Sequence, residues 1–320
     1  MDGKQLRWRW ATIAVLGSAL AGGASADGYQ AVKTAEPLPI VKGVEVEVGL
    51  GIMQGEANEF VYRRDGSRLS QLVWAFDNNL VFKGGVAVRP WNWLAVGARF
   101  VTNVTDGSTM DDYDWYRPSE PDYADCPNGY CHSHHPDTTL ESYLSVDAYA
   151  AATFYRTQSI ALTALAGYKR DSQSWQAMDG PSNYTSFTPG RLSISYDQVW
   201  EAPYLGAQFN GEWGRWALQG RVIGSWWAQG QDEDDHHLRT LLFTEKFGES
   251  NMIGANAHLG YRLTENLLLK AEYDLQQWQL GKGPSADVNY TTGTERYRGW
   301  NAGGGESITQ TIFMGAALEY

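Results

Sequence analysis

Apolar and polar residues alternate with a period of two along most of the chain. In residues 44–52, valine, leucine and isoleucine alternate with glutamate and glycine. Similar alternation recurs in residues 80–88, 144–154, 160–166, 205–209, 216–222, 267–275 and 312–320. Because successive side chains of an extended chain point to opposite faces, this pattern predicts β-strands rather than helices. No run of about 18 apolar residues follows the N-terminal segment, so helical membrane spans are excluded.

Two classes of connection separate the predicted strands. Short turns are expected at 89–92, 210–212 and 263–266, and long polar stretches at 103–140, 170–198, 229–250 and 279–306. Short turns at one end and long loops at the other are typical of an outer-membrane barrel, as are many glycines and aromatic residues. We therefore predict an all-β fold, a single antiparallel transmembrane β-barrel with long outer loops and an even number of roughly 8 to 12 strands.

The first 26 residues have the features of a secretory signal peptide. Three basic residues precede a weakly apolar stretch from Ala11 to Gly23, and the small residues at 24–26 provide a cleavage pattern. The apolar stretch is too short to anchor the chain in a membrane. We predict that residues 1–26 are removed and that residues 27–320 form one exported domain.

The chain is acidic, with 25 basic and 37 acidic residues and a formal net charge of −12. Residues 1–26 carry Asp2 against three basic residues, so their removal leaves a net charge of −14. This charge argues against nucleic acid as a partner and favours a cationic substrate. Fold alone does not decide the function, because small barrels also serve as pores and anchors.

Two acidic clusters lie where strand patterns give way to polar stretches. The first reads Asp-Asp-Tyr-Asp-Trp from position 111, and the second reads Asp-Glu-Asp-Asp-His-His from position 232. Asp112 and Asp114 share one side of a strand, and Asp234 and His236 do the same. If both pairs face the lumen, Asp234 can orient the imidazole, and the opposite pair can hold a water for attack on a peptide carbonyl. The alternative is that the clusters bind calcium or are simply solvated.

Histidine and cysteine residues suggest further kinds of site. Two histidine clusters could bind zinc together with carboxylates, but the chain has no His-Glu-x-x-His helix, and we expect no metal. No Gly-x-Ser-x-Gly elbow supports a serine hydrolase, and Ser133 lies beside two histidines by coincidence. Cys126 and Cys131 favour a local disulfide over a metal site, which needs more thiolates.

Several motifs resemble those of the omptin family, the outer-membrane endoproteases of Gram-negative bacteria. The matching segments are Ser70-Gln71-Leu72-x-Trp74 with the strand through Lys83-Gly84, Met110-Asp111-Asp112-Tyr113-Asp114-Trp115, His135-Pro136-Asp137-Thr138 followed by Leu140, and Asp232-x-Asp234-x-His236. Each segment alone is unspecific. Their combination in this order is specific, and it covers most of the mature chain.

The resemblance implies a ten-stranded barrel in the outer membrane of a Gram-negative bacterium, with its active site facing outside. It implies an aspartic-type endopeptidase in which Asp112 and Asp114 form one pair and Asp234 orients His236. His236 would be the general base that activates a water, so no acyl-enzyme would form. Substrates would be surface-accessible peptides and proteins, cut next to Arg or Lys and preferably between two basic residues.

The resemblance also implies roles in binding. Glu59 and Asp232 match the two acidic residues that bind the basic side chain before the cleaved bond. Omptins need lipopolysaccharide, bound by basic residues on the outer wall. The position matching one of these residues holds Ser172, with Lys169 and Arg170 nearby. We expect a monomer that has no cofactor and uses lipopolysaccharide as a lipid activator.

The sequence departs from the family pattern in a few places. Cys126 and Cys131 are unusual for the family and lie in a loop, 116–134, that is longer than usual, so a disulfide could reshape the substrate groove. His237 is an additional imidazole beside His236. The competing interpretation is a catalytically silent barrel that acts as an adhesin or receptor. A passive pore is disfavoured, because a barrel this small fills its interior with side chains.

Overall fold

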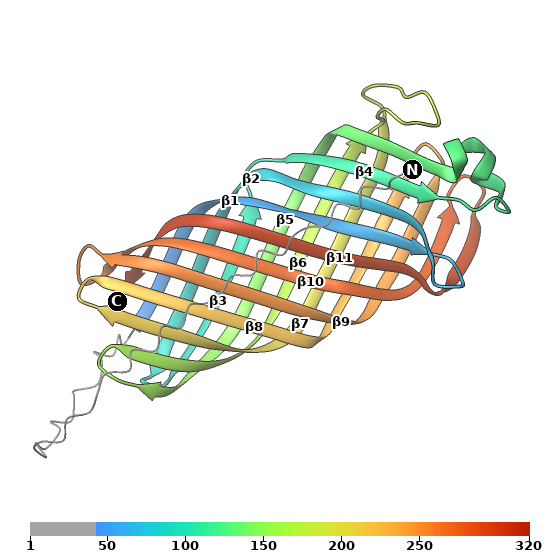
Figure 1. Ribbon diagram of the computed structural model, residues 1–320. Helices are drawn as coiled ribbons and strands as arrows, with labels where there is room; N and C mark the ends of the chain where they lie inside the picture. The colour runs from blue at the N-terminus through green and yellow to red at the C-terminus, as the bar shows by residue number, and fades with distance from the viewer. Residues whose placement is uncertain (1–42) are drawn as a thin grey trace, which may run out of the picture. The chain divides into compact units, whose positions relative to one another are not determined.

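The computed structural model describes residues 43–320, which close into an antiparallel β-barrel (Figure 1). The predicted signal peptide, residues 1–26, lies outside the described residues. The strands are β1 (Gly43–Tyr62), β2 (Arg68–Trp91), β3 (Leu94–Asn103), β4 (Gly107–Trp115), β5 (Tyr130–Arg156), β6 (Ile160–Met178), β7 (Leu192–Trp213), β8 (Trp216–His236), β9 (Leu241–Arg262), β10 (Leu267–Asn289) and β11 (Thr294–Glu319). Two short 3-10 helices, η1 (Pro121–Asp125) and η2 (Pro127–Gly129), lie between β4 and β5. Within residues 43–320, no helix is long and apolar enough to cross a bilayer.

The 11 strand segments fill 10 positions around the ring. β3 and β4 both lie between β2 and β5, and each pairs with a different half of these two long strands. β1 pairs with both β2 and β11, so the sheet is closed and has no free edge. The predicted fold class is confirmed, as are the ten strands that the resemblance implied.

One half of the barrel has an apolar outer surface. Along the first half of β1, every second side chain is apolar and exposed, and the intervening residues face the lumen. The final residues of β11 repeat this arrangement. An apolar outer band is what contact with lipid requires. The turn expected at 210–212 instead lies at 214–215, because β7 continues to Trp213.

Charged side chains fill the lumen of this half. Lys83 of β2 reaches across to Glu272 of β10, with Nζ 2.6 Å from Oε1. Asp147 of β5 binds two guanidinium groups, those of Arg99 at 2.7 Å and Arg221 at 2.9 Å. Each of these buried charges therefore has a partner of opposite sign, as burial requires.

The strands continue well beyond the apolar band. Most residues of the four long polar stretches are strand, and the connections at this end are only 63–67, 116–129, 179–191, 237–240 and 290–293. Figure 1 shows that η1 and η2 lie at the end of the barrel opposite to the chain's C-terminus. Beyond the apolar band the outward-facing residues are mostly polar, which is why these strands resemble loops in the sequence.

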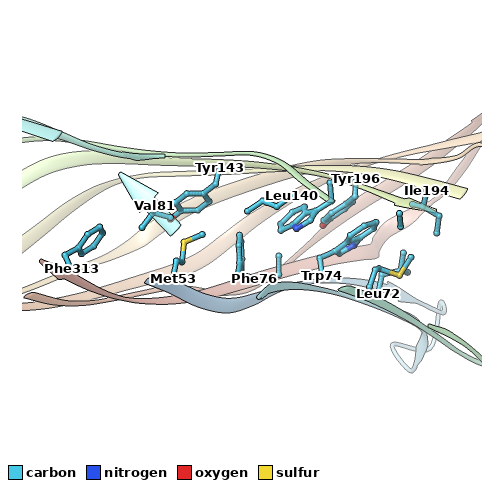
Figure 2. Close-up of a cluster of buried hydrophobic side chains, with 14 residues drawn as sticks. Met53, Leu72, Trp74, Phe76, Val81, Leu140, Tyr143, Ile194, Tyr196 and Phe313 are labelled. Carbon is cyan, nitrogen blue, oxygen red and sulfur yellow. The ribbon is translucent and has the colours of Figure 1, made fainter. Parts of the chain in front are cut away.

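Large aromatic side chains fill the lumen between the charged half and the barrel mouth (Figure 2). Trp74 stacks on Tyr196 with ring centroids 5.2 Å apart, and its centroid lies 5.7 Å from that of Trp175. Phe76 and Leu140 complete the packing, and all five side chains are buried. We call these five residues the aromatic floor, because the candidate active site lies directly above them.

Candidate active site

β4 carries two of the candidate residues on its inner face. Asp112 lies opposite Leu72 of β2, and Asp114 lies opposite Ser70. The Ser70 hydroxyl donates to Asp112 Oδ1 at 3.5 Å. Because the two aspartates are two residues apart on one strand, both carboxylates point to the same side, where they line a cavity with His236.

β8 supplies the second pair. Asp234 is 1% exposed, and its Oδ2 lies 2.6 Å from His236 Nε2. The other ring nitrogen, Nδ1, lies 2.5 Å from an Arg239 Nη2 atom. His237, the additional imidazole, instead lies with its Nε2 2.8 Å from Ser195 Oγ. The structure therefore joins Asp234 to His236, and it separates His237 from this pair.

One cavity of 550 Å³ brings β4 and β8 together. Asp112, Asp114, His236 and Arg239 all line it. Burial, followed by the charge of Asp114, raises the pKa of Asp112 well above its usual range. Burial also raises the pKa of Asp114, opposed by its hydrogen bond with Ser70. These raised pKa values mean that the pair takes up protons more readily than free aspartates do.

A cluster of three carboxylates is buried next to this cavity. Glu59 of β1, Asp232 of β8 and Glu245 of β9 each offer an oxygen, and these atoms all lie within 4.8 Å of one another. We call these residues the acidic cluster. Sequence reasoning identified Glu59 and Asp232 but missed Glu245. Its signal was the alternating Phe-x-Glu-x-Phe from position 243, which places an acid among inward-facing apolar residues.

The loop between β4 and β5 forms another wall of the cavity. Cys126 and Cys131 are joined by a disulfide, with Cα atoms 4.9 Å apart, and both residues line the cavity. Glu120, earlier in the loop, forms an ion pair of 2.5 Å with Arg63 in the connection between β1 and β2. The loop that carries the cysteines is therefore tied to the mouth at two points.

The three histidines of β5 divide between its two faces. His132 and His134 lie on Asp111, with ring nitrogens 2.9 Å and 3.0 Å from Asp111 Oδ1. His135 faces the cavity, and its Nε2 lies 2.9 Å from Ser133 Oγ. Among residues 43–320, the acidic cluster is the one group of three potential metal ligands with closely spaced donor atoms, and it contains no histidine.

The two basic residues named for lipid binding face opposite ways. Lys169 points into the lumen, where its Nζ donates to Ser145 Oγ at 2.8 Å. Arg170 is exposed and forms an ion pair of 2.9 Å with Glu201. Only Arg170 of these two is therefore available to a lipid headgroup.

A family model described as the omptin family matches residues 40–320. The chain belongs to this family. The omptin is similar to the plasminogen activator of Yersinia pestis, with 27% identity over 316 residues, or 96% of this chain and 97% of the relative. It is also similar to the outer membrane protease OmpP of Escherichia coli strain K12, with 27% identity over 274 residues, or 81% of this chain and 85% of the relative.

The crystal structure of the outer membrane protease OmpT from Escherichia coli has the same fold. Its TM-score is 0.79 at 23% sequence identity, and the similarity covers 90% of this chain and 99% of that one. The family and the barrel together place this omptin among the outer-membrane proteases of Gram-negative bacteria.

Proposed function

We propose that this omptin is an endopeptidase that cleaves surface-accessible peptides and proteins next to lysine or arginine, preferably between two basic residues. The observation that carries the proposal is the cavity in which the carboxylates of Asp112 and Asp114 meet His236, itself held by Asp234. A hydrogen-bonded base facing an acidic pair across an open cavity can activate water for hydrolysis.

The reaction needs no covalent intermediate with the enzyme. Asp112 and Asp114 hold a water, and His236 removes its proton as the oxygen attacks the peptide carbonyl carbon. Asp234 holds the ring in position and stabilises the imidazolium that forms, much as the carboxylate of a catalytic triad does. The imidazolium then returns the proton to the leaving amine as the carbon–nitrogen bond breaks.

Specificity comes from Glu59 and Asp232, whose carboxylates are 1% and 3% exposed. A basic side chain entering beside them forms charge-assisted hydrogen bonds, which are about twice as strong as neutral ones. An apolar side chain would leave both carboxylates buried without a cation to balance their charge, so it is rejected.

The proposal includes lipopolysaccharide as an activator and a monomeric protein. The exposed Arg170 on the outer wall is available to an anionic headgroup once its ion pair with Glu201 opens. The requirement for lipopolysaccharide is tested in the same experiment as the peptidase activity.

A quenched peptide containing Arg-Arg tests the proposal. Refolded protein with lipopolysaccharide should cleave between the arginines, and protein without it should be inactive. Asp112→Ala and His236→Ala should each lower kcat by at least about a hundredfold, because each removes a group that acts in the transition state. Gel mobility before and after heating checks that each barrel is folded.

The matched control is the pair Asp234→Asn and Asp235→Asn, the same change on neighbouring residues of β8. Asp235 contacts His237 rather than His236, so its variant should keep full activity, whereas Asp234→Asn should lose most of it. Folded protein that cleaves no basic peptide would favour the adhesin or receptor interpretation. Equal activity of both variants would remove Asp234 from the mechanism.

A further inference from the structure

The acidic cluster contains a third carboxylate, that of Glu245, besides those of the two proposed specificity residues, Glu59 and Asp232. Asp232 of β8 and Glu245 of β9 lie directly opposite each other in the sheet register. Like charges at directly opposed positions destabilise a sheet. Glu59 approaches the same point from β1, which is separated from β9 by β10 and β11. Three strands therefore direct carboxylates at one point inside the mouth.

None of the three carboxylates is fully satisfied by the protein. Their side chains are 1% to 3% exposed, and each has one oxygen with no hydrogen-bond partner in the described part of the chain. The other contacts are few: the Tyr196 hydroxyl donates to Asp232 at 2.9 Å, and Glu245 accepts from the Gly304 amide at 3.2 Å and from the Ser285 side chain. Buried acceptors of this kind call for a cation that carries its own donors.

The barrel wall provides space for the third carboxylate. Gly303 of β11 faces Glu245, and a Cβ atom at this position would lie 2.2 Å from Glu245 Oε2. Any larger residue would therefore displace the carboxylate. A glycine at this position of β11 lets Glu245 occupy the inner face of the wall.

The spacing of the cluster suits an ammonium group. With N···O distances of about 2.8 Å, the three donors of a tetrahedral –NH₃⁺ reach acceptors about 4.6 Å apart. The three oxygens all lie within 4.8 Å of one another, so one –NH₃⁺ group can contact all of them. A guanidinium is flat, and its paired donors match a single carboxylate better than three that converge from different strands.

We propose that Glu245 completes a three-carboxylate subsite for a primary ammonium group, so that this omptin prefers lysine to arginine before the cleaved bond. The inference rests on the proposed function and deepens it by naming the third specificity residue and the preferred side chain. Glu245 acts on substrate binding and takes no part in the attack by water.

Three peptides that differ only in Lys, Arg or norleucine before the cleaved bond test the inference. Wild-type protein should cleave the Lys peptide several-fold more efficiently than the Arg peptide. Glu245→Gln should raise KM for the Lys peptide by about tenfold to a hundredfold, raise it less for the Arg peptide, and leave kcat nearly unchanged. Glu233→Gln is the matched control, because Glu233 neighbours Asp232 but is exposed.

Calorimetric titration of the full-length, refolded protein with n-butylammonium separates this inference from the peptidase assignment. Binding that Glu245→Gln weakens at least about tenfold, and Glu233→Gln does not, supports the ammonium subsite even if no peptide is cleaved. Unchanged binding in Glu245→Gln, equal effects on the Lys and Arg peptides, or equal effects on the norleucine peptide would overturn it.

Discussion

Three alternate residues of β8 lie in three different parts of the candidate site. Asp232 belongs to the acidic cluster, Asp234 is buried behind the imidazole, and His236 lines the cavity. Their two-residue spacing keeps all three on the inner face, while Glu233 and Asp235 face the other way. In the proposed function, one rigid strand therefore carries both a group that binds the basic side chain and the groups that activate water. A shift of its register by one residue would remove all three groups from the mouth.

The acidic cluster predicts how cation binding depends on pH. Burial, followed by the charge of Asp234, raises the pKa of Glu245 to about 8. Burial and neighbouring carboxylates also raise the pKa of Glu59 and of Asp232 well above their usual range. A raised carboxyl pKa means that the cluster holds protons at neutral pH and becomes fully charged only as the pH rises. Affinity for n-butylammonium should therefore increase between about pH 6 and about pH 9.

Binding of n-butylammonium isolates this effect from the proposed catalytic base, because it does not involve His236. The groups that face Glu245 are Glu59 on β1, Tyr196 on β7, Asp232 and Asp234 on β8, and Ser285 on β10. Glu245→Gln should flatten the increase in affinity. Affinity that is constant or falls with pH would contradict the raised pKa.

The two-residue spacing of the acidic residues and the histidine predicted more of the candidate site than any single motif did. The two-residue steps at 112–114 and 234–236 place each pair on one face, since a strand leaves no other choice. Glu245 was missed because the local Phe-x-Glu-x-Phe alternation shows only that its side chain shares a face with two phenylalanines. Its position opposite Asp232 in the sheet is what brings the two carboxylates together. That register depends on the pairing of β8 with β9, which no local pattern contains.

At the scale of elements, the loop between β4 and β5 controls one wall of the cavity. Replacing Cys126 and Cys131 with serine should release this wall while the barrel stays folded, because the ladder of strands does not depend on the disulfide. Loop ordering worth about 2 kcal/mol would be lost. KM for peptide substrates should rise by up to about tenfold with little change in kcat. The measurement is steady-state kinetics of the double variant and of wild-type protein with and without reductant.

Reductant should change the wild-type enzyme toward the double variant and should leave the double variant unchanged. The ion pair of Arg63 with Glu120 remains in both proteins, so the loop stays near the mouth. Identical KM values for the oxidised, reduced and substituted proteins would show that the disulfide does not shape the substrate groove.

Alternation predicted strands reliably where lipid covers the wall, and it failed above the membrane. Residues 229–236 contain no aliphatic side chain, so they resemble a loop in the sequence. They form the end of β8 because their inner face lines an acidic site and their outer face meets water. The same polar outer surface concealed the upper parts of β6, β9 and β10. Strand pairing, rather than a contrast between an apolar and a polar face, decides where these strands end.

Considered as a whole, the molecule is a tube whose interior is filled in layers. Paired charges occupy the membrane half, the aromatic floor follows, and the candidate site lies above it. The packed rings of the floor lie between the membrane half and the site, so in the proposed function substrates enter from the outer end.

The net charge of the whole molecule adds a long-range effect to these contacts. A formal net charge of −12, with Asp112, Asp114, Asp234 and the three carboxylates of the acidic cluster in one mouth, should attract cationic peptides before they dock. Raising NaCl from about 20 mM to about 200 mM should then lower kcat/KM for a strongly cationic peptide by about tenfold and leave kcat unchanged. The control peptide keeps the same cleaved bond but carries added glutamates that make it neutral, and its kcat/KM should hardly change. Equal salt dependence for the two peptides would mean that salt acts on the barrel or its lipid rather than on the encounter.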